Sequence, residues 1–219
     1  MIRLSQVCKR FGAVTAVDGV SLTIDPGERV ALVGTNGSGK TTLLRAMAGL
    51  VRTEGTVLIN GIDVAKEPEK ALRCVAYVPQ LAPPIDAPVG EVLRTWSALR
   101  GRPVKVVLDY AARLGLASVD GVRFRDLSGG MKQKLMAAMA LASEAEVLLC
   151  DEPTANLDTV SRRAFFEAVD ERRSTGVLIL CSHRADDAWH LVNRVVQLSE
   201  GKVVGDAPVV EAMACRSVA

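Results

Sequence analysis

The sequence predicts an α/β fold in which a parallel core sheet is combined with an N-terminal antiparallel β layer and a helical insert. An apolar run at residues 30–33 leads through a glycine-rich loop into a helical pattern. Apolar runs at 147–150 and 177–181 alternate with helical patterns, as in parallel sheets with right-handed crossovers. Residues 2–8 and 20–24 alternate apolar and polar side chains, as half-buried antiparallel strands do.

Composition and charge limit the classes of protein to which the chain can belong. Its 219 residues are 49% hydrophobic, enough for a sizeable core. The formal net charge of +2 gives no sign of a nucleic-acid-binding surface, and we expect no nucleic-acid partner. The longest apolar run, residues 135–142, is far shorter than the roughly 18 residues of a membrane span, and the start of the chain lacks a signal peptide's apolar core. We therefore expect a soluble, cytoplasmic chain without direct membrane insertion.

The first half of the chain supplies most of the expected strands. A turn at 25–27 precedes the strand at 30–33, and a strand at 55–59 runs into the hairpin signal Asn60-Gly61. Residues 74–78 form a further strand, which ends at Pro79.

Residues 81–127 are predicted to form a small helical insert. Three prolines between residues 83 and 88 break any regular element at its start. Helical patterns follow at 89–100 and 104–115. Beyond the insert we expect helices at 131–143, 159–173 and 185–192, then two short strands around residues 200–201.

Residues 34–41 match the pattern G-x-x-x-x-G-K-[ST] between a strand and a helix, the context of a phosphate-binding P-loop. Glycines let successive N–H groups point at phosphate oxygens, and the helix adds its positive end. Lys40 can reach the β- and γ-phosphates, and the Thr41 hydroxyl can ligate Mg²⁺. A plain Gly/Ser-rich turn is the alternative. The predicted nucleotide-binding residues here are Gly34, Asn36, Gly37, Ser38, Gly39, Lys40, Thr41 and Thr42.

Two adjacent acids, Asp151 and Glu152, follow the buried strand at 147–150. Ligands of open parallel sheets sit outside the carboxyl ends of the strands, where the P-loop also lies. Asp151 can hold Mg²⁺ directly or through water. Glu152 can then orient or deprotonate a water that attacks the γ-phosphate. The alternative is that the two acids merely begin a loop.

In this order, the motifs resemble those of the nucleotide-binding subunit of an ATP-binding cassette (ABC) transporter, over residues 2–205. They are the P-loop at 34–41, Gln80 like the Q-loop, residues 127–130 (Leu-Ser-Gly-Gly) like the signature motif, 151–152 like the Walker B end, 155–158 like the D-loop, and His183 like the switch histidine. The resemblance implies one ABC ATPase domain over 1–219. Its parts would be a catalytic core plus β layer (1–80 and 128–205), a helical subdomain (81–127) and a C-terminal tail (206–219).

The resemblance also assigns a second anion site to Ser128, Gly129 and Gly130 at the start of a helix. In the family this site closes on the γ-phosphate held by the P-loop of a partner subunit, so two subunits pair head to tail around two ATP molecules. A simple helix N-cap would explain Ser128 but not the paired glycines.

Four further residues take their roles from the resemblance alone. Gln80 would contact Mg²⁺ and the attacking water, and His183 would contact the γ-phosphate and Glu152. Phe11 would stack on adenine, and Asp158 of the D-loop belongs to the nucleotide-binding set. Taken singly, Gln80 would be a solvated loop residue, His183 structural, and Phe11 a core or strand-end residue. The implied catalytic residues are Glu152, His183, Gln80 and Lys40, and the implied metal ligands are Thr41, Gln80 and Asp151.

Four positions depart from the usual family pattern. One is Phe11, which lacks the hydroxyl of the commoner Tyr but keeps a ring that can stack. Met131 stands where many members have Gln or Glu, Lys134 where they have Arg, and Asn156 where Gly is more usual. None of these changes removes a group needed for hydrolysis, and Asn accepts left-handed backbone angles.

The resemblance implies an ATPase that uses ATP and Mg²⁺ to drive a separate membrane-spanning permease subunit, paired with a second copy of itself or a paralogous ATPase. It would be peripheral on the inner face of the cell membrane. Trp96 would contribute to docking if it were exposed, and otherwise belongs to the core. The pattern of residues after Ser128 and the short length of the chain favour an exporter. The alternatives are an importer ATPase and a soluble ABC ATPase, such as one of iron–sulfur assembly. A small-molecule kinase would leave residues 128–130 and the paired acids without a joint purpose.

Overall fold

The computed structural model describes residues 1–116, 118–119, 121–172, 176–181 and 189–211. The chain divides into two compact units, each described here by itself. The first contains Met1–Tyr77, Glu146–Asp151 and Ser174–Ala219, and the second contains Val78–Ala145 and Glu152–Arg173. The second unit therefore includes the helices that follow the predicted insert 81–127 as well as the insert. Among the described residues, every helix is too short or too polar to span a membrane.

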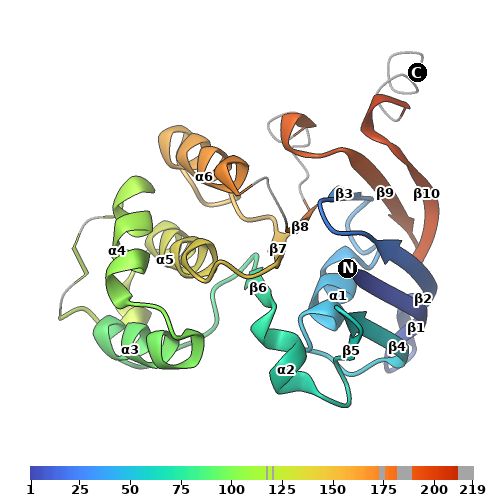
Figure 1. The fold of residues 1–219 in the computed structure, drawn as a ribbon, viewed down its shortest axis with the longest axis horizontal. Helices are drawn as coiled ribbons and strands as arrows, with labels where there is room; N and C mark the ends of the chain where they lie inside the picture. The colour runs from blue at the N-terminus through green and yellow to red at the C-terminus, as the bar shows by residue number, and fades with distance from the viewer. Residues whose placement is uncertain (117, 120, 173–175, 182–188, 212–219) are drawn as a thin grey trace. The chain divides into compact units, whose positions relative to one another are not determined.

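A four-stranded antiparallel sheet makes up the predicted N-terminal layer (Figure 1). Its strands, in the order β2-β1-β4-β5, are β1 (Ile2–Phe11), β2 (Val14–Ile24), β4 (Glu54–Ile59) and β5 (Ile62–Asp63). Ile2 is opposite both Ile24 and Ile59, so apolar side chains gather on one face. The tight turn between β4 and β5 is the hairpin that Asn60-Gly61 predicts.

A six-stranded sheet forms the core of the first unit. Its strands, in the order β10-β9-β3-β8-β7-β6, are β3 (Arg29–Val33), β6 (Val75–Val78), β7 (Val147–Asp151), β8 (Val177–Cys181), β9 (Arg194–Ser199) and β10 (Lys202–Pro208). β3 runs parallel to β8 and β9, and β7 runs parallel to β8, whereas β10 forms an antiparallel hairpin with β9. The carboxyl ends of β3, β7 and β8 therefore lie at one edge, where α/β sheets bind ligands.

Helix α1 (Lys40–Met47) contacts strands of both sheets. Leu43, Leu44 and Met47 are fully buried in a cluster that also holds Ile2 of β1 and Leu32 of β3. An isolated helix of this length is marginal in water, so packing rather than intrinsic propensity fixes α1. The helix that begins at the P-loop is thus held firmly between the sheets.

The second unit is helical, as predicted. Its elements are α3 (Val89–Arg100), α4 (Val104–Arg113), the short 3₁₀ helix η1 (Phe124–Asp126), α5 (Gly129–Ala142) and α6 (Thr159–Glu171). α4 packs on α3 and α5, and α5 packs on α6 (Figure 1). Trp96 is 9% exposed, which confirms the interpretation of Trp96 as a core residue and excludes it as an exposed docking residue. Val89, Leu93 and Trp96 share one helical face, and burial of that face takes the indole ring with it.

Two predictions near the C-terminus differ from the structure or fall outside it. The first half of the predicted helix at 185–192 lies outside the described residues, and the described second half contains the 3₁₀ turn η3 (Trp189–Leu191). β10 extends through Pro208, into the segment predicted as a tail, because Asp206 and Pro208 pair with Val196 and Arg194 of β9. In the first half of the chain, helix α2 (Pro68–Arg73) was not predicted.

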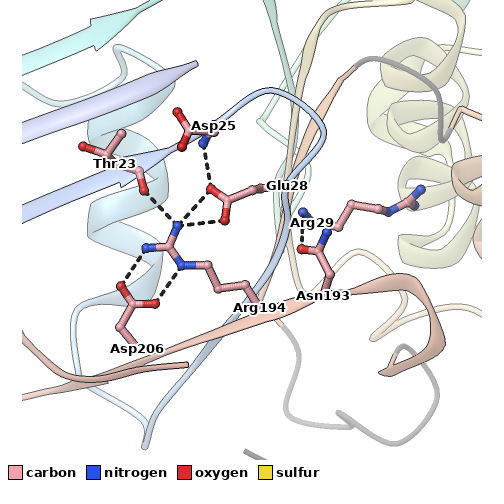
Figure 2. Close-up of polar contacts among 7 residues, drawn as sticks. All are labelled: Thr23, Asp25, Glu28, Arg29, Asn193, Arg194 and Asp206. Carbon is pink, nitrogen blue, oxygen red and sulfur yellow. Dashed lines mark hydrogen bonds and ion pairs between the residues drawn. The ribbon is translucent and has the colours of Figure 1, made fainter. Parts of the chain in front are cut away.

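Arg194 joins the two sheets of the first unit (Figure 2). Its guanidinium donates two hydrogen bonds to the Asp206 carboxylate, at 2.7 and 2.6 Å, and two to the Glu28 carboxylate, at 3.0 and 2.9 Å. It also donates to the carbonyl oxygen of Thr23 at 2.9 Å. These hydrogen bonds, first those with Asp206, raise the pKa of Arg194 above its usual value. The end of β2, the start of β3 and the β9-β10 hairpin are thereby tied to one side chain.

Candidate nucleotide-binding site

The glycine loop after β3 is shaped by close contacts with neighbouring strands. Gly34 has a φ of 152° and Gly39 a φ of 103°, values that other residues rarely adopt. A Cβ atom on Gly34 would lie 2.3 Å from the carbonyl oxygen of Leu198 in β9, and one on Gly39 would lie 2.2 Å from that of Ala16 in β2. Side chains at these positions would displace the loop, so the two glycines are required sterically as well as conformationally.

Lys40 is the first residue of α1 and lies beneath this loop. It is 8% exposed, and its Nζ donates hydrogen bonds to the carbonyl oxygens of Gly34 and Thr35, both at 2.9 Å. The N-cap of α1 is Gly39, which has no side chain to occupy the N–H groups of the first turn. A buried ammonium and the positive end of a helix therefore converge on the loop, an arrangement that suits an anion such as phosphate.

The Asp151 carboxylate lies at the end of β7 and is 1% exposed. Its Oδ1 accepts a hydrogen bond from Oγ1 of Thr41 at 3.1 Å, and its Oδ2 accepts one from the hydroxyl of Tyr77 at 3.2 Å. The structure thus brings together the two residues, one from the P-loop and one from the end of β7, that were predicted to share a metal. Burial, and then the negative charge of Asp151, raises the pKa of Tyr77 and keeps its hydroxyl protonated.

The donor set at Thr41 and Asp151 fits Mg²⁺. A hydroxyl oxygen and a carboxylate oxygen, 3.1 Å apart, are both hard oxygen ligands of the kind that Mg²⁺ prefers. Mg²⁺ also retains water and phosphate ligands, so two protein oxygens are enough to hold it beside a bound triphosphate.

Ser128 begins the signature helix in the second unit. Its Oγ accepts a hydrogen bond from the N–H of Met131 at 3.2 Å, so Ser128 is the N-cap of α5, and it is exposed. Gly129 is also exposed at the helix start. A Cβ atom on Gly130 would lie 3.0 Å from the carbonyl oxygen of Asn156. The N-cap interpretation is therefore confirmed for Ser128, and Gly130 allows the segment around Asn156 to approach α5 closely.

Asp158 is held within its own chain. Its carboxylate caps α6 by accepting from the N–H and the Oγ of Ser161, both at 2.8 Å, and from the Nζ of Lys134 at 3.0 Å. These bonds, first the one from the Ser161 N–H, lower the pKa of Asp158 below its usual range. Its predicted part in nucleotide binding stays a prediction.

Three more predicted residues have recorded surroundings that suit their roles. Phe11 is 51% exposed, which leaves its ring free to stack on a base, and the Nζ of Lys9 lies 5.0 Å from the ring centroid. Gln80 is half-buried and follows β6 after one intervening residue, Pro79. Glu152 is half-buried and has a φ of 47°, an uncommon backbone conformation for a residue other than glycine. His183 lies outside the described residues.

A family model described as "ABC transporter" matches residues 17–155. The chain belongs to the ABC transporter family. It is 37% identical to the phosphonates import ATP-binding protein PhnC of Frankia casuarinae, over 94% of this chain and 89% of that protein. It is 33% identical to the Nod factor export ATP-binding protein I of Paraburkholderia xenovorans, over 94% of this chain and 70% of that protein.

Other relatives are much longer. The chain is 37% identical to the ABC transporter ced-7 of Caenorhabditis elegans over 86% of its own length, but spans only 11% of that protein. Among solved structures, an ATP-binding cassette crystallised as a dimer with ADP and phosphate has a TM-score of 0.83 and 25% identity, over 95% of this chain and 99% of that one. The predicted family and fold class are confirmed, and the chain is an ATP-binding ABC-type ATPase.

The predicted site residues are distributed over both units of this ABC ATPase. The P-loop and Asp151 belong to the first unit, whereas Gln80, residues 128–130 and Glu152 belong to the second. How these groups meet around ATP stays a prediction. Sequence reasoning missed two polar residues, Tyr77 and Gln133, which hydrogen-bond to Asp151 and to the neighbours of Gln80 and Glu152. For Tyr77 the available signal was a tyrosine within an apolar strand, because buried polar groups require partners. Gln133 lies between Lys132 and Lys134, so its local sequence carried no such signal.

Proposed function

We propose that this ABC ATPase hydrolyses Mg²⁺-bound ATP to power translocation by a separate membrane-spanning permease subunit. The contact between the Thr41 hydroxyl and the buried Asp151 carboxylate, at 3.1 Å, carries the proposal. It joins the P-loop to the end of β7 and provides two hard oxygen ligands next to a phosphate-binding helix start. Mg²⁺, when bound, would neutralise charge on the β- and γ-phosphates.

Different residues of the chain have different roles in hydrolysis. Lys40 and the first N–H groups of α1 bind the phosphates, and Phe11 stacks on adenine. Glu152 orients the attacking water or accepts its proton. Gln80 contacts the metal and the water, and His183 contacts the γ-phosphate.

Two cassettes complete each other's sites in this proposal. Ser128, with Gly129 and Gly130, presents an exposed helix start that suits the γ-phosphate bound by a second copy or a paralogous ATPase. The dimer of the related ADP-bound cassette supports this pairing. ATP would close the dimer and hydrolysis would reopen it, which moves the permease partner. The ATPase would then lie peripherally on the inner face of the cell membrane.

We further propose that the permease is an exporter, because the residues that follow Ser128 resemble those of small exporter ATPases. One relative is named for import and another for export, so import is the second candidate. Purification from membranes should recover an integral membrane protein with this chain. Reconstitution of that pair in vesicles then measures whether substrate leaves or enters the ATPase side. Recovery of a soluble scaffold protein instead would contradict the transport function.

The catalytic assignment is tested first by Lys40→Ala. Removal of the buried ammonium should lower phosphate release from ATP about 100-fold or more, since Lys40 binds the phosphates throughout the reaction. Phosphate release by the purified protein measures this. Lys66→Ala, at an exposed lysine outside the site, is the matched control and should leave turnover unchanged. Equal turnover in the Lys40 and Lys66 variants would contradict the assignment.

A further inference from the structure

Gln133 is a buried polar residue on α5 that the proposed mechanism has not used. Its side chain is 1% exposed. Its Nε2 donates hydrogen bonds to the carbonyl oxygens of Pro79 and Pro153, both at 3.1 Å. Pro79 directly precedes Gln80, and Pro153 directly follows Glu152. One amide group therefore holds the main chain beside two predicted catalytic residues.

Both acceptors are carbonyl oxygens of proline residues, which offer few main-chain hydrogen bonds. Proline has no N–H group, so the carbonyl oxygen is the one main-chain hydrogen-bonding group that Pro79 or Pro153 offers. Both prolines are buried, and a buried carbonyl without a donor is unfavourable. Loss of the Gln133 amide would therefore favour a shift of both segments.

The same face of α5 holds the chain after Glu152 at further points. Gly130 lies one helical turn before both Gln133 (i, i+3) and Lys134 (i, i+4), so it neighbours each of them on the surface of the helix. A Cβ atom on Gly130 would lie 3.0 Å from the Asn156 carbonyl oxygen, and the Nζ of Lys134 lies 3.0 Å from Oδ2 of Asp158. The segment 153–158 is thus attached along this helix face.

Glu152 itself needs such support. Its φ of 47° is a backbone conformation that costs free energy in a residue other than glycine. Residues persist in such conformations when their surroundings hold them, and the bond from Gln133 to Pro153 holds the next residue along the chain.

We propose that Gln133 is a positioning residue that sets Gln80 and Glu152 together, from the same helix that begins at Ser128. The inference rests on the proposed function, in which these two residues act on the attacking water. Gln133 touches neither ATP nor water in this account and acts through Pro79 and Pro153. Its loss should therefore lower kcat and leave ATP affinity, which depends on the P-loop, nearly unchanged.

Gln133→Met tests this, because methionine has similar length and no hydrogen-bond donor. The expected result is a fall in kcat of about 10- to 100-fold, since small displacements of catalytic groups cost this much. The affinity for a fluorescent ATP analogue should stay within about twofold of the wild type. Gln197→Met, at an exposed position of β9, is the matched control and should leave both values unchanged. Should the methionine variant not fold, Gln133→Leu is the second variant, because leucine likewise has no hydrogen-bond donor and buries no charge.

A double-mutant cycle separates positioning from a general loss of stability. Because Gln133 acts in part through Glu152, the combination of Gln133→Met with Glu152→Gln should slow single-turnover reactions by less than the product of the two separate losses. Losses that multiply, or a Gln133→Met variant that matches the Gln197→Met control, would overturn the inference. If Glu152→Gln alone retained full turnover, the proposed function itself would fail, and the two failures are thus distinguishable.

Discussion

Asp151 shows how single residues build this site. A carboxylate that is 1% exposed is stable only when its oxygens have donors, and here Thr41 and Tyr77 occupy one oxygen each. The Thr41 contact gives Asp151 its place beside the P-loop. The Tyr77 contact fixes the carboxylate from the other oxygen, so that its orientation does not depend on the metal alone.

Tyr77→Phe should therefore weaken the use of Mg²⁺ more than the binding of ATP. The change removes the donor to Oδ2 of Asp151 and keeps the ring. We expect kcat to fall about 10-fold and the Mg²⁺ concentration for half-maximal turnover to rise, because hydrogen bonds that orient a metal-binding side chain are worth about 10- to 100-fold in metal affinity or activity. Phosphate release measured over a series of Mg²⁺ concentrations tests this.

Tyr110→Phe on α4 provides the control. Tyr110 packs against Arg113 through its ring, which phenylalanine keeps, and the change should leave turnover and Mg²⁺ dependence as they are. An unchanged Mg²⁺ dependence in Tyr77→Phe would remove Tyr77 from this account.

At the residue scale, the sequence predicted the residues that belong to recognisable motifs. It missed the residues that hydrogen-bond to those motifs and hold them in place. Thr41 and Asp151 could be paired because each follows a buried strand of a parallel sheet. Tyr77 and Gln133 could not, because their partners are set by packing between elements distant in the sequence. The same is true of the glycine contacts, in which Gly39 lies against Ala16 of another strand.

At the element scale, periodicity was a good guide where an element was long or fully apolar. The strands β7 and β8 and the helices α3 and α5 were predicted almost to their ends. Helix α2 was missed because six residues make fewer than two turns, too few for a helical period to show. The pairing of β10 beyond residue 205 was missed because its alternating half-exposed side chains carry little apolar signal.

We predict that the hydrogen bonds of Arg194 between the two sheets contribute measurably to the free energy of unfolding. Arg194→Met keeps most of the packing but removes the bonds to Thr23, Glu28 and Asp206. The free energy of unfolding should fall by about 1–3 kcal/mol, as expected for the loss of charged hydrogen bonds in a partly buried place. Urea denaturation followed by circular dichroism measures the loss.

Arg163→Met on α6 is the matched control for that measurement. Arg163 is exposed and, within the described part of the chain, its ion pair is with Glu167 one helical turn away, so its removal should change the free energy of unfolding by about 0.5 kcal/mol or less. Equal losses from the two variants would show that Arg194 does not tie the sheets together.

At the scale of the whole molecule, the account depends on sites that one chain does not complete alone. The P-loop and Asp151 belong to the first unit, and the exposed start of α5 at Ser128 belongs to the second. We propose that the second of these lies opposite the nucleotide of a partner cassette, and a related cassette was solved as a dimer. The sequence predicted this organisation through the order of its motifs, whereas the structure of a single chain describes each half of the site separately.

The most direct test is the oligomeric state of the Glu152→Gln variant with and without Mg²⁺ and ATP. Sedimentation equilibrium measures it as the molar mass of the protein in solution. Neutralising the acid that acts on the attacking water should leave ATP bound and unhydrolysed, so the account predicts a monomer without nucleotide and a stable dimer with ATP. Lys40→Ala under the same conditions should remain monomeric. A Glu152→Gln protein that stays monomeric at saturating ATP would contradict the claim that two copies complete each nucleotide site.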